Sequence, residues 1–421
     1  MNVLLATDVF PPVCGGSGWS TYELARGLRA RGHGVLIVQP KPGQPDGVRE
    51  TSHDGFRVLE FGAAAPNVPY VRNYFKNERL HRKLATFLED VARRERSDIL
   101  HGQHVLTGLP SIEAAERAHI PSVCTVRDYW PVCYWSDLIH TRDEAALCPE
   151  CSAGMMTRCI RPRAGAAWPA ALPMIPYMRA NLARKRRGLA AAGTVVAVSS
   201  AIAADLAARA PELLETPITV IPNPVDMTRL REAAAASARP LAEPYALYLG
   251  KLAPNKGTAH LPDIARDADL RWPLIVAGDG PDRAALEGEA ARAGRDIRFL
   301  GWVDQPRATA LLAHAAMLIF PSRGPESLSR VLIEASALGV PIAAMVTGGT
   351  GDIVQHGVTG LLSDTPAALA GDVRRLAADA ELRRRLGAAA RTRAEERFDS
   401  PRVLERIEAL YRDLVAARAV S

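Results

Sequence analysis

Residues 317–345 read MLIFPSRGPESLSRVLIEASALGVPIAAM and contain one strand–helix–strand unit. MLIFPS is a short continuous apolar run, which is typical of a buried strand. In the segment that follows, Leu328, Val331, Leu332 and Ala335 recur with helical spacing, and PIAAM is again strand-like. Two strands joined by a helix normally pair in parallel, so this stretch predicts an α/β fold.

The same alternation of strand-like and helix-like segments fills the rest of the chain. We expect strands at VLLATDVF, HGVLIVQP, SDILHGQH, IPSVCTVRD, GTVVAVSS, PITVIPNPVD, YALYLGKL, PLIVAGDG and IRFLGWV. Such alternation implies parallel sheets with helices on both faces. We therefore expect two doubly wound α/β domains, at residues 1–226 and 245–397, with a proline-punctuated linker at 231–244. A last helix should occupy residues 398–421.

The 421-residue chain shows no signal for export. The apolar run in MNVLLATDVF is too short for a signal peptide, and no basic residue precedes it. The least polar stretch, residues 188–204, carries glycine, threonine and serine, so a strand followed by a helix explains it better than a membrane span. We expect a cytoplasmic protein, with a peripheral position at the inner face of the membrane as an alternative.

The positive charge is concentrated in one region. The net charge is +6, but residues 151–204 contain no acidic residue and eight arginines and lysines, namely Arg158, Arg161, Arg163, Arg179, Arg184, Lys185, Arg186 and Arg187. Such a stretch favours phosphorylated ligands or an anionic membrane surface, and an ordinary solvated face is the alternative. Nucleic acid is not expected as a partner, because no nucleic-acid module accompanies the charge.

Two glutamates stand eight positions apart in GPESLSRVLIEASALGVP. Glu326 opens the predicted helix, and Glu334 lies within an almost wholly apolar part of it, where a solvated glutamate is not expected. Eight helical residues rise about 12 Å. That span suits one carboxylate on a donor sugar and the other on a ribose two phosphates away. Backbone N–H groups at the helix start, at Ser327 and Leu328, would favour an anion.

Two lysines lie in the strand-to-helix segment LYLGKLAPNKG. Lys251 and Lys256 could bind a diphosphate and stabilise it as a leaving group, although a pair of surface lysines is the alternative. Glycine-rich turns follow several predicted strands, where the backbone can approach a phosphate closely. These turns contain Gly15, Gly16, Gly250 and Gly278.

The order of these motifs resembles glycosyltransferase family four. The resemblance rests on the early Gly-Gly loop, SDILHGQH, VIPNPVD, GKLAPNKG, AGDGP, FLGWV and PES followed by E-x7-E. It implies the GT-B fold, with two facing Rossmann-like domains and a C-terminal helix that crosses back to the first. It also implies that the first domain binds the acceptor and the second a nucleotide-diphosphate sugar, commonly linked to UDP or GDP. The family's chemistry retains the anomeric configuration and generally needs no divalent metal.

The resemblance assigns roles to individual residues. Glu334 matches the ribose-binding carboxylate and Glu326 the sugar-contacting one. Lys256 matches the phosphate-binding lysine, and Lys251 stands where an arginine is usual. Val303 lies near the usual base contact, while the loop of Gly15 and Gly16 matches the one that closes over the donor phosphates.

The chain departs from the family pattern at SDILHGQH. Family members often read H-x-H here, and the second histidine contacts the donor sugar near the reacting centre. Gln103 occupies that position, with His104 one residue on. An amide can hydrogen-bond a sugar hydroxyl but cannot become charged. We assign both side chains to the neighbourhood of the reaction.

Four cysteines cluster in an insertion-like segment at residues 128–163, namely Cys133, Cys148, Cys151 and Cys159. The single C-x2-C with two flanking cysteines is compatible with a structural zinc site, and free thiols in a loop are the alternative. The same segment carries Trp130, Tyr134 and Trp135. These aromatic rings could stack on a sugar or lipid acceptor, or form a small core for the insertion.

Three functions remain open from the sequence. The first is a retaining glycosyltransferase that acts on a sugar, polysaccharide-precursor or lipid-linked acceptor. The second is a sugar-nucleotide epimerase, which would share the architecture but needs an acid/base set that the sequence does not display. The third is a non-catalytic protein that binds sugar nucleotides or a membrane surface. Gln103 favours the third, whereas Glu326, Lys256 and Glu334 favour the first.

Overall fold

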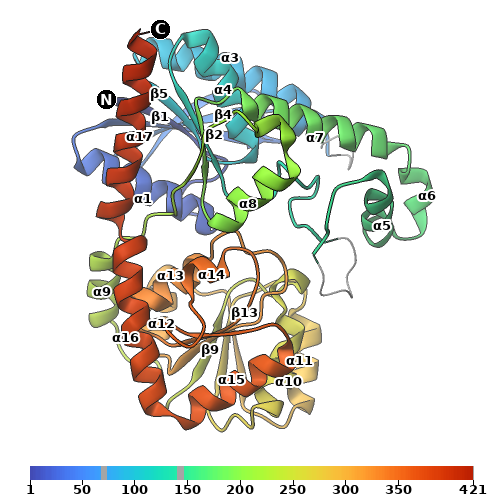
Figure 1. Cartoon of the computed structure of the whole chain (residues 1–421), viewed down its shortest axis with the longest axis vertical. Helices are drawn as coiled ribbons and strands as arrows, with labels where there is room; N and C mark the ends of the chain where they lie inside the picture. Colours follow the sequence, from blue (N-terminus) through green and yellow to red (C-terminus); the bar gives the residue numbers. More distant parts are fainter. Residues whose placement is uncertain (68–73, 140–146, 421) are drawn as a thin grey trace. The chain divides into compact units, whose positions relative to one another are not determined.

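A computed structural model describes residues 1–67, 74–139 and 147–420 of the chain. It contains two compact units (Figure 1). The N-terminal unit comprises Met1–Asp137, Pro149–Pro224 and Ser400–Ser421, and the C-terminal unit comprises Leu138–Cys148 and Val225–Asp399. Each is built around its own parallel sheet.

The N-terminal unit contains an eight-stranded sheet in the order β3-β4-β2-β1-β5-β6-β7-β8. All neighbouring strands are parallel except β3 and β4, which form an antiparallel hairpin through Asp54 and Gly55. The elements are β1 (Asn2–Ala6), α1 (Gly16–Ala30), β2 (Gly34–Pro42), β3 (Gly47–His53), β4 (Phe56–Ala63), the π-helical turn η1 (Phe75–Arg79), α3 (Leu80–Arg94), β5 (Ile99–Gly102), α4 (Val105–Ala118), β6 (Ser122–Val126), α5 (Ala153–Ala164), η2 (Gly165–Ala167), α6 (Trp168–Ala171), α7 (Met174–Ala190), β7 (Thr194–Ala197), α8 (Ser200–Arg209), η3 (Pro211–Leu213), β8 (Ile218–Val220) and α17 (Ser400–Val420).

The sheet of the N-terminal unit is buried on both faces. Successive residues of β1 alternate between them, because side chains in a strand point to opposite sides. Val3 and Leu5 belong to a core shared with α1 and α17, while Leu4 and Ala6 belong to a core shared with α3 and α4. These strands therefore appear in the sequence as continuous apolar runs rather than alternating ones.

The last helix of the chain, α17, packs against the first helix of the N-terminal unit. A Cβ on Gly27 of α1 would lie 2.1 Å from a methyl carbon of Leu404, so the absence of a side chain at Gly27 allows this close contact. Glu408 of α17 accepts hydrogen bonds from Arg31 at 2.7 Å and pairs with His33 at 2.6 Å. The C-terminal helix is thus an integral part of the first unit.

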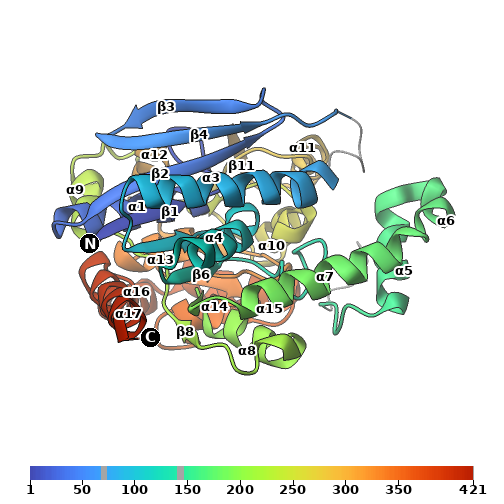
Figure 2. The ribbon, with the colours of Figure 1, turned by 90° about the horizontal axis from the view of Figure 1, so that it is seen from above.

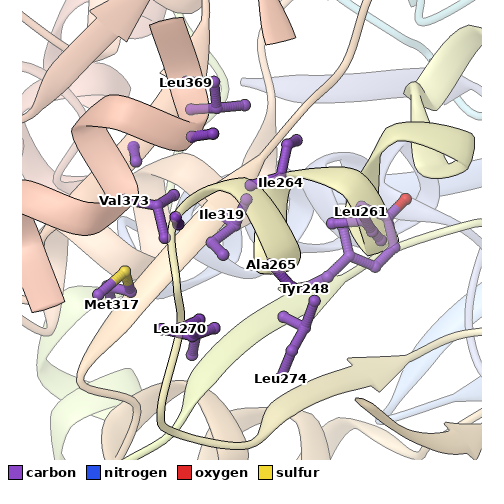
Figure 3. Packing of buried hydrophobic residues seen from close by; sticks show 14 of the residues in the cluster. Tyr248, Leu261, Ile264, Ala265, Leu270, Leu274, Met317, Ile319, Leu369 and Val373 are labelled. Carbon is purple, nitrogen blue, oxygen red and sulfur yellow. The ribbon is translucent and has the colours of Figure 1, made fainter. Parts of the chain in front are cut away.

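The C-terminal unit contains a six-stranded parallel sheet in the order β11-β10-β9-β12-β13-β14. Figure 3 shows its core, where side chains of α10 and α15 meet those of β9, β10 and β12. The elements are α9 (Met227–Ala235), β9 (Ala246–Leu249), the 3-10 turns η4 (Pro254–Lys256) and η5 (Thr258–His260), α10 (Leu261–Asp267), β10 (Leu274–Ala277), α11 (Arg283–Arg292), β11 (Ile297–Gly301), α12 (Gln305–Ala313), β12 (Met317–Phe320), α13 (Arg330–Ala337), β13 (Ile342–Met345), α14 (Thr350–Ile353), β14 (Leu361–Ser363), α15 (Pro366–Ala378) and α16 (Ala380–Arg397).

The segment between β6 and β7 adds three helices to the N-terminal unit. Helix α7 extends away from the sheet, and α5 and α6 lie at its N-terminal end (Figure 2). Met156 and Ile160 of α5 pack against Met178 and Leu182 of α7, so the insertion has a small core of its own. Residues 140–146 of the expected insertion lie outside the described residues.

Two expectations about local structure are wrong. The segment 231–244 is not a linker throughout, because α9 extends to Ala235; the Asp226 carboxylate caps its start by accepting from the Arg229 amide at 2.9 Å. The helix of the GPESLSRVLIEASALGVP motif begins at Arg330 rather than at Glu326. Glu326 therefore lies in the loop after β12, and the 12 Å helical rise between Glu326 and Glu334 does not apply.

Candidate functional site

Each sheet has one point at which the winding of the chain reverses. In the N-terminal unit β1 lies between β2 and β5, and in the C-terminal unit β9 lies between β10 and β12. Ligands of open α/β sheets bind at such switch points, outside the carboxyl ends of the strands. The loops after β1 and β5 carry Asp8, Gln103 and His104, and those after β9 and β12 carry Lys256 and Glu326.

Lys256 and Glu326 meet at the switch point of the C-terminal unit. The Lys256 Nζ lies 2.5 Å from Glu326 Oε1, and the Ser322 hydroxyl donates to the same oxygen at 2.5 Å. Glu326 is 8% exposed, whereas the Lys256 side chain is 30% exposed. The structure therefore holds the buried Glu326 carboxylate against the partly exposed Lys256 ammonium group. A ligand that binds here contacts the positive charge and lies close to the negative one.

Glycines bring the loops around this pair into backbone contact. A Cβ at Gly257 would lie 1.9 Å from the Pro321 carbonyl oxygen, and one at Gly348 would lie 2.1 Å from the Glu326 carbonyl oxygen. Both glycines have a left-handed φ, +63° and +48°. A larger residue would push the loops apart, so the glycines hold Glu326 at its place.

Glu334 is held by a neighbour on the same helix. Arg330 Nε donates to Glu334 Oε1 at 2.7 Å, one helical turn away, and Glu334 is 7% exposed. The Arg330 Nη1 is buried and has no hydrogen-bond partner within the described part of the chain. The carboxylate expected to bind the ribose is thus paired with the Arg330 guanidinium, which has a further N–H group at Nη1 available to donate a hydrogen bond.

The other expected donor contacts surround the same strand ends. The Lys251 side chain is exposed, and its carbonyl accepts from the Tyr248 hydroxyl at 2.8 Å. Gly250 and Gly278 touch, since a Cβ on Gly278 would lie 1.8 Å from the Gly250 carbonyl oxygen. The remaining positions are half-buried or buried in loops: Val303, Ser327 and Leu328.

Gln103 in the N-terminal unit is a buried side chain. It is 1% exposed, and its Oε1 accepts from Arg127 Nη2 at 2.5 Å. Arg127 also donates to the Asn223 side chain. The amide oxygen of Gln103 thus faces a buried arginine, whereas its Nε2 has no hydrogen-bond partner among the described residues. The expected contact of Gln103 with a sugar stays a prediction.

His104 is the accessible side chain of this loop. Its Nε2 lies 3.6 Å from Asp128 Oδ2, its Nδ1 lies 4.0 Å from Asp8 Oδ2, and its side chain is 19% exposed. Burial raises the pKa of Asp128, while the charge of His104 lowers it. Asp8 accepts from the amides of Leu106 and Thr107 at 3.1 Å and so fixes the start of α4.

The loop of Gly15 and Gly16 opens helix α1. Gly15 is the N-cap, and a Cβ there would meet no atom within 4 Å. A Cβ on Gly18 would lie 2.5 Å from the Cys14 sulfur, so this glycine is needed for packing. The backbone at Gly15 and Gly16 is accessible to a ligand.

The four clustered cysteines do not form a metal site in the structure. Among the residues it describes, no three histidine, cysteine, aspartate or glutamate side chains are grouped so as to hold an ion. Burial raises the pKa of Cys159 to about 11, and the nearby Cys133 and Cys151 add to the effect. Cys148 falls in the segment Leu138–Cys148, which is assigned to the C-terminal unit, and its backbone N–H donates to the Leu138 carbonyl at 2.7 Å. The zinc expectation therefore has no structural support.

The family of the chain follows from its sequence over both units. Residues 14–229 match the family described as Glycosyltransferase Family 4, and residues 231–393 match Glycosyl transferases group 1. The chain belongs to glycosyltransferase family 4. The expected family is thereby confirmed, and the protein is a glycosyltransferase that uses nucleotide sugars.

Relatives of this family 4 glycosyltransferase cover nearly the whole chain. It is 28% identical to a glycogen synthase of Mycobacterium tuberculosis, over 95% of this chain and 91% of the relative. It is 29% identical to a GDP-mannose-dependent alpha-mannosyltransferase of Mycolicibacterium smegmatis, over 93% of this chain and 92% of the relative. A structure of Anabaena HepE in complex with UDP-glucose has a TM-score of 0.65 at 19% identity, with 98% and 99% coverage. This likeness confirms the expected GT-B fold.

Three polar residues beside Gln103 and His104 were not among the site residues expected from the sequence. Asp8, Arg127 and Asp128 each lie within two residues of the end of a strand, closer than Lys256 and Glu326 lie to the ends of β9 and β12. Polar residues at the carboxyl ends of adjacent parallel strands are the signal that could have found them.

Within the described residues, no helix is long and apolar enough to cross a membrane.

Proposed function

We propose that the protein is a retaining glycosyltransferase that moves a sugar from a UDP- or GDP-linked donor to a sugar, polysaccharide-precursor or lipid-linked acceptor. The contact between Lys256 and Glu326 at the switch point of the C-terminal unit carries this proposal. The C-terminal unit binds the nucleotide sugar and the N-terminal unit binds the acceptor.

Lys256 and Glu326 have complementary roles in the proposed reaction. When the bond between the anomeric carbon and the diphosphate oxygen breaks, the electron pair stays on the diphosphate. Lys256, assisted by the exposed Lys251, offsets that charge. Glu326 accepts hydrogen bonds from sugar hydroxyls. Because Glu326 contacts Lys256, the two side chains can bind the sugar and the diphosphate of the same donor molecule.

The configuration is retained if the acceptor attacks from the face that the diphosphate leaves. The acceptor hydroxyl oxygen bonds to the anomeric carbon, and its proton passes to an oxygen of the departing diphosphate. The protein then acts through positioning and charge stabilisation. Glu334 binds the ribose of the donor, supported by Arg330 at 2.7 Å.

The acceptor side uses the polar cluster of the N-terminal unit. His104 lies within 4.0 Å of both Asp8 and Asp128, so the three side chains offer donors and acceptors to a polyhydroxylated ligand. A GDP-linked donor is supported by the mannosyltransferase relative, and a UDP-linked donor by the HepE complex.

The test is release of nucleotide from a panel of UDP-, GDP- and ADP-sugars without acceptor. We expect slow release from one donor, lost in Glu334→Ala and kept in Glu289→Ala, where Glu289 is an exposed residue of α11. Proton NMR of the product made with an acceptor then gives the anomeric configuration. An inverted product would refute retention, and an epimerised nucleotide sugar would establish the alternative function.

A further inference from the structure

The insertion of the N-terminal unit forms most of a half-open apolar cavity of about 420 Å³. Its walls come from α5, α6, α7, the loop after β6 and Tyr74, and they include Tyr134, Trp135, Ile160, Met174, Tyr177 and Met178. Cavities of 300–1,000 Å³ are of the size that binds small molecules. The cavity lies outside the polar strand ends described above, and the small core of the insertion does not fill it.

Two polar groups on the wall of the cavity are engaged with the protein. The Tyr177 hydroxyl donates to Glu78 Oε1 at 3.2 Å, and Arg163 Nη2 donates to Asp137 Oδ2 at 2.6 Å. The rings of Tyr134 and Trp135 meet edge to face at 5.2 Å. The Trp135 indole N–H is buried without a hydrogen-bond partner among the described residues. A ligand in the cavity therefore meets mainly aromatic rings, methionines and aliphatic carbon.

A buried lysine lies beside one wall of the cavity. Lys185 of α7 lies 6.0 Å from the ring centre of Tyr134, which lines the cavity, and 6.0 Å from that of Trp130. Lys185 is 8% exposed; burial lowers the pKa of its ammonium group to about 8, and the charge of Asp128 opposes that shift. Lys185 therefore interacts electrostatically with Asp128, whose Oδ2 lies 3.6 Å from His104 Nε2.

We propose that this cavity binds the apolar group of an amphipathic acceptor, an alkyl or aryl chain whose hydroxyl-bearing head lies at His104 and Asp128. The proposal rests on the proposed transfer to an acceptor in the N-terminal unit and names the chemistry of that acceptor. Arg158, Arg179 and Arg187 of α5 and α7 are exposed, and this cationic surface of the insertion suits an amphiphile that carries an anionic group.

Alkyl glucosides provide a direct test. Binding of hexyl, heptyl and octyl glucoside, each below its micellar concentration, is measured by calorimetry on the full chain. We expect about fourfold tighter binding for each added methylene, as burial of a methylene group from water predicts. Glucose itself should bind much more weakly than the octyl compound.

Two substitutions on one short helix separate the cavity from its surroundings. Ala171 of α6 lines the cavity, whereas the neighbouring Ala170 is exposed and does not. Ala171→Phe should weaken the binding of octyl glucoside at least tenfold, and Ala170→Phe should leave its affinity within twofold of that of the unsubstituted protein. Ala164→Phe, at the end of α5, fills the cavity from another side and repeats the test if Ala171→Phe folds poorly.

Binding of UDP or GDP to the same variants separates this proposal from the proposed function. Unchanged nucleotide affinity shows that the C-terminal unit is intact, whereas no nucleotide binding in the unsubstituted protein would refute the transferase and leave the cavity result to stand alone. The cavity proposal would be overturned if the affinity for alkyl glucosides were independent of chain length. It would also be overturned if Ala171→Phe and Ala170→Phe lost that affinity equally. Binding to phosphatidylglycerol vesicles without any binding of alkyl glucosides would overturn it in favour of a membrane-contact surface.

Discussion

His101 and Tyr411 stand 310 positions apart in the sequence and share a hydrogen bond of 2.6 Å between the His101 Nδ1 and the Tyr411 hydroxyl. The other ring nitrogen lies 2.6 Å from the Thr125 hydroxyl. Both residues are fully buried. The imidazole therefore joins the centre of the sheet to the C-terminal helix, which makes it a structural residue rather than a catalytic one.

This arrangement predicts acid sensitivity of the N-terminal unit. Burial lowers the pKa of His101 to about 3, below its ordinary value of 6.5. The folded state thus binds fewer protons than the unfolded state, so stability is present above pH 6.5 and is lost as the pH falls toward 3. The slope contributed by His101 should approach about 1.4 kcal/mol per pH unit. In His101→Gln, calorimetry should show a weaker dependence of the unfolding midpoint on pH, and an unchanged dependence would contradict the assignment.

The contact between Lys256 and Glu326 predicts opposite effects on binding and on transfer. Glu326→Gln removes a negative charge 2.5 Å from the ammonium group. Affinity for free UDP or GDP should stay equal or rise several-fold, because Lys256 is then available to the phosphates. Sugar transfer should fall by at least 100-fold, because the sugar loses a charged acceptor. Glu289→Gln is the control, and a parallel loss of nucleotide affinity and transfer would refute the separation of roles.

The pair of Arg330 and Glu334 predicts a cost in both stability and nucleotide binding. Arg330→Met leaves the 7% exposed Glu334 without its partner. We expect a loss of about 1–3 kcal/mol in the stability of the C-terminal unit, the usual cost of an unsatisfied buried group. Nucleotide affinity should fall about tenfold. Arg330→Lys should recover part of the stability, and calorimetry with and without UDP measures both effects. Full nucleotide affinity in Arg330→Met would show that the pair has no part in binding.

The sequence carried much of the information on the C-terminal unit, because each motif there is local. A strand, a loop and a helix within thirty residues bring Glu326 and Glu334 into one segment, and the glycine turns mark where loops must touch. The start of α13 was misplaced because one of the contacts of Glu326 comes from outside its own segment. Ser322 and Lys256 bind the Glu326 side chain, and that contact holds residues 321–329 in the loop.

Long-range pairs were beyond the reach of the sequence. Gln103 and Arg127 are 24 positions apart, and no pattern in SDILHGQH shows that an arginine will bury the amide. The cavity walls come from residues 74 to 178, so the cavity depends on how α5, α6 and α7 pack rather than on any motif. The expected linker at 231–244 was partly wrong. A run of alanines followed by prolines is found both at the end of a helix and in a connecting segment, so the sequence did not show that α9 extends to Ala235.

The loop after β5 supplies a final prediction, since it separates a supporting side chain from one that touches ligand. Gln103→Ala should lower the thermal midpoint, because the buried Arg127 loses the acceptor that now lies 2.5 Å away. His104→Ala should leave the midpoint within about 2 °C and lower kcat/KM for the acceptor by about 10- to 1,000-fold, because His104 is accessible and lies between Asp8 and Asp128. Nucleotide release without acceptor should be unaffected in His104→Ala. If His104→Ala instead unfolds the N-terminal unit while Gln103→Ala loses only activity, the two roles are reversed, and the acceptor site must be rebuilt around the amide and Arg127.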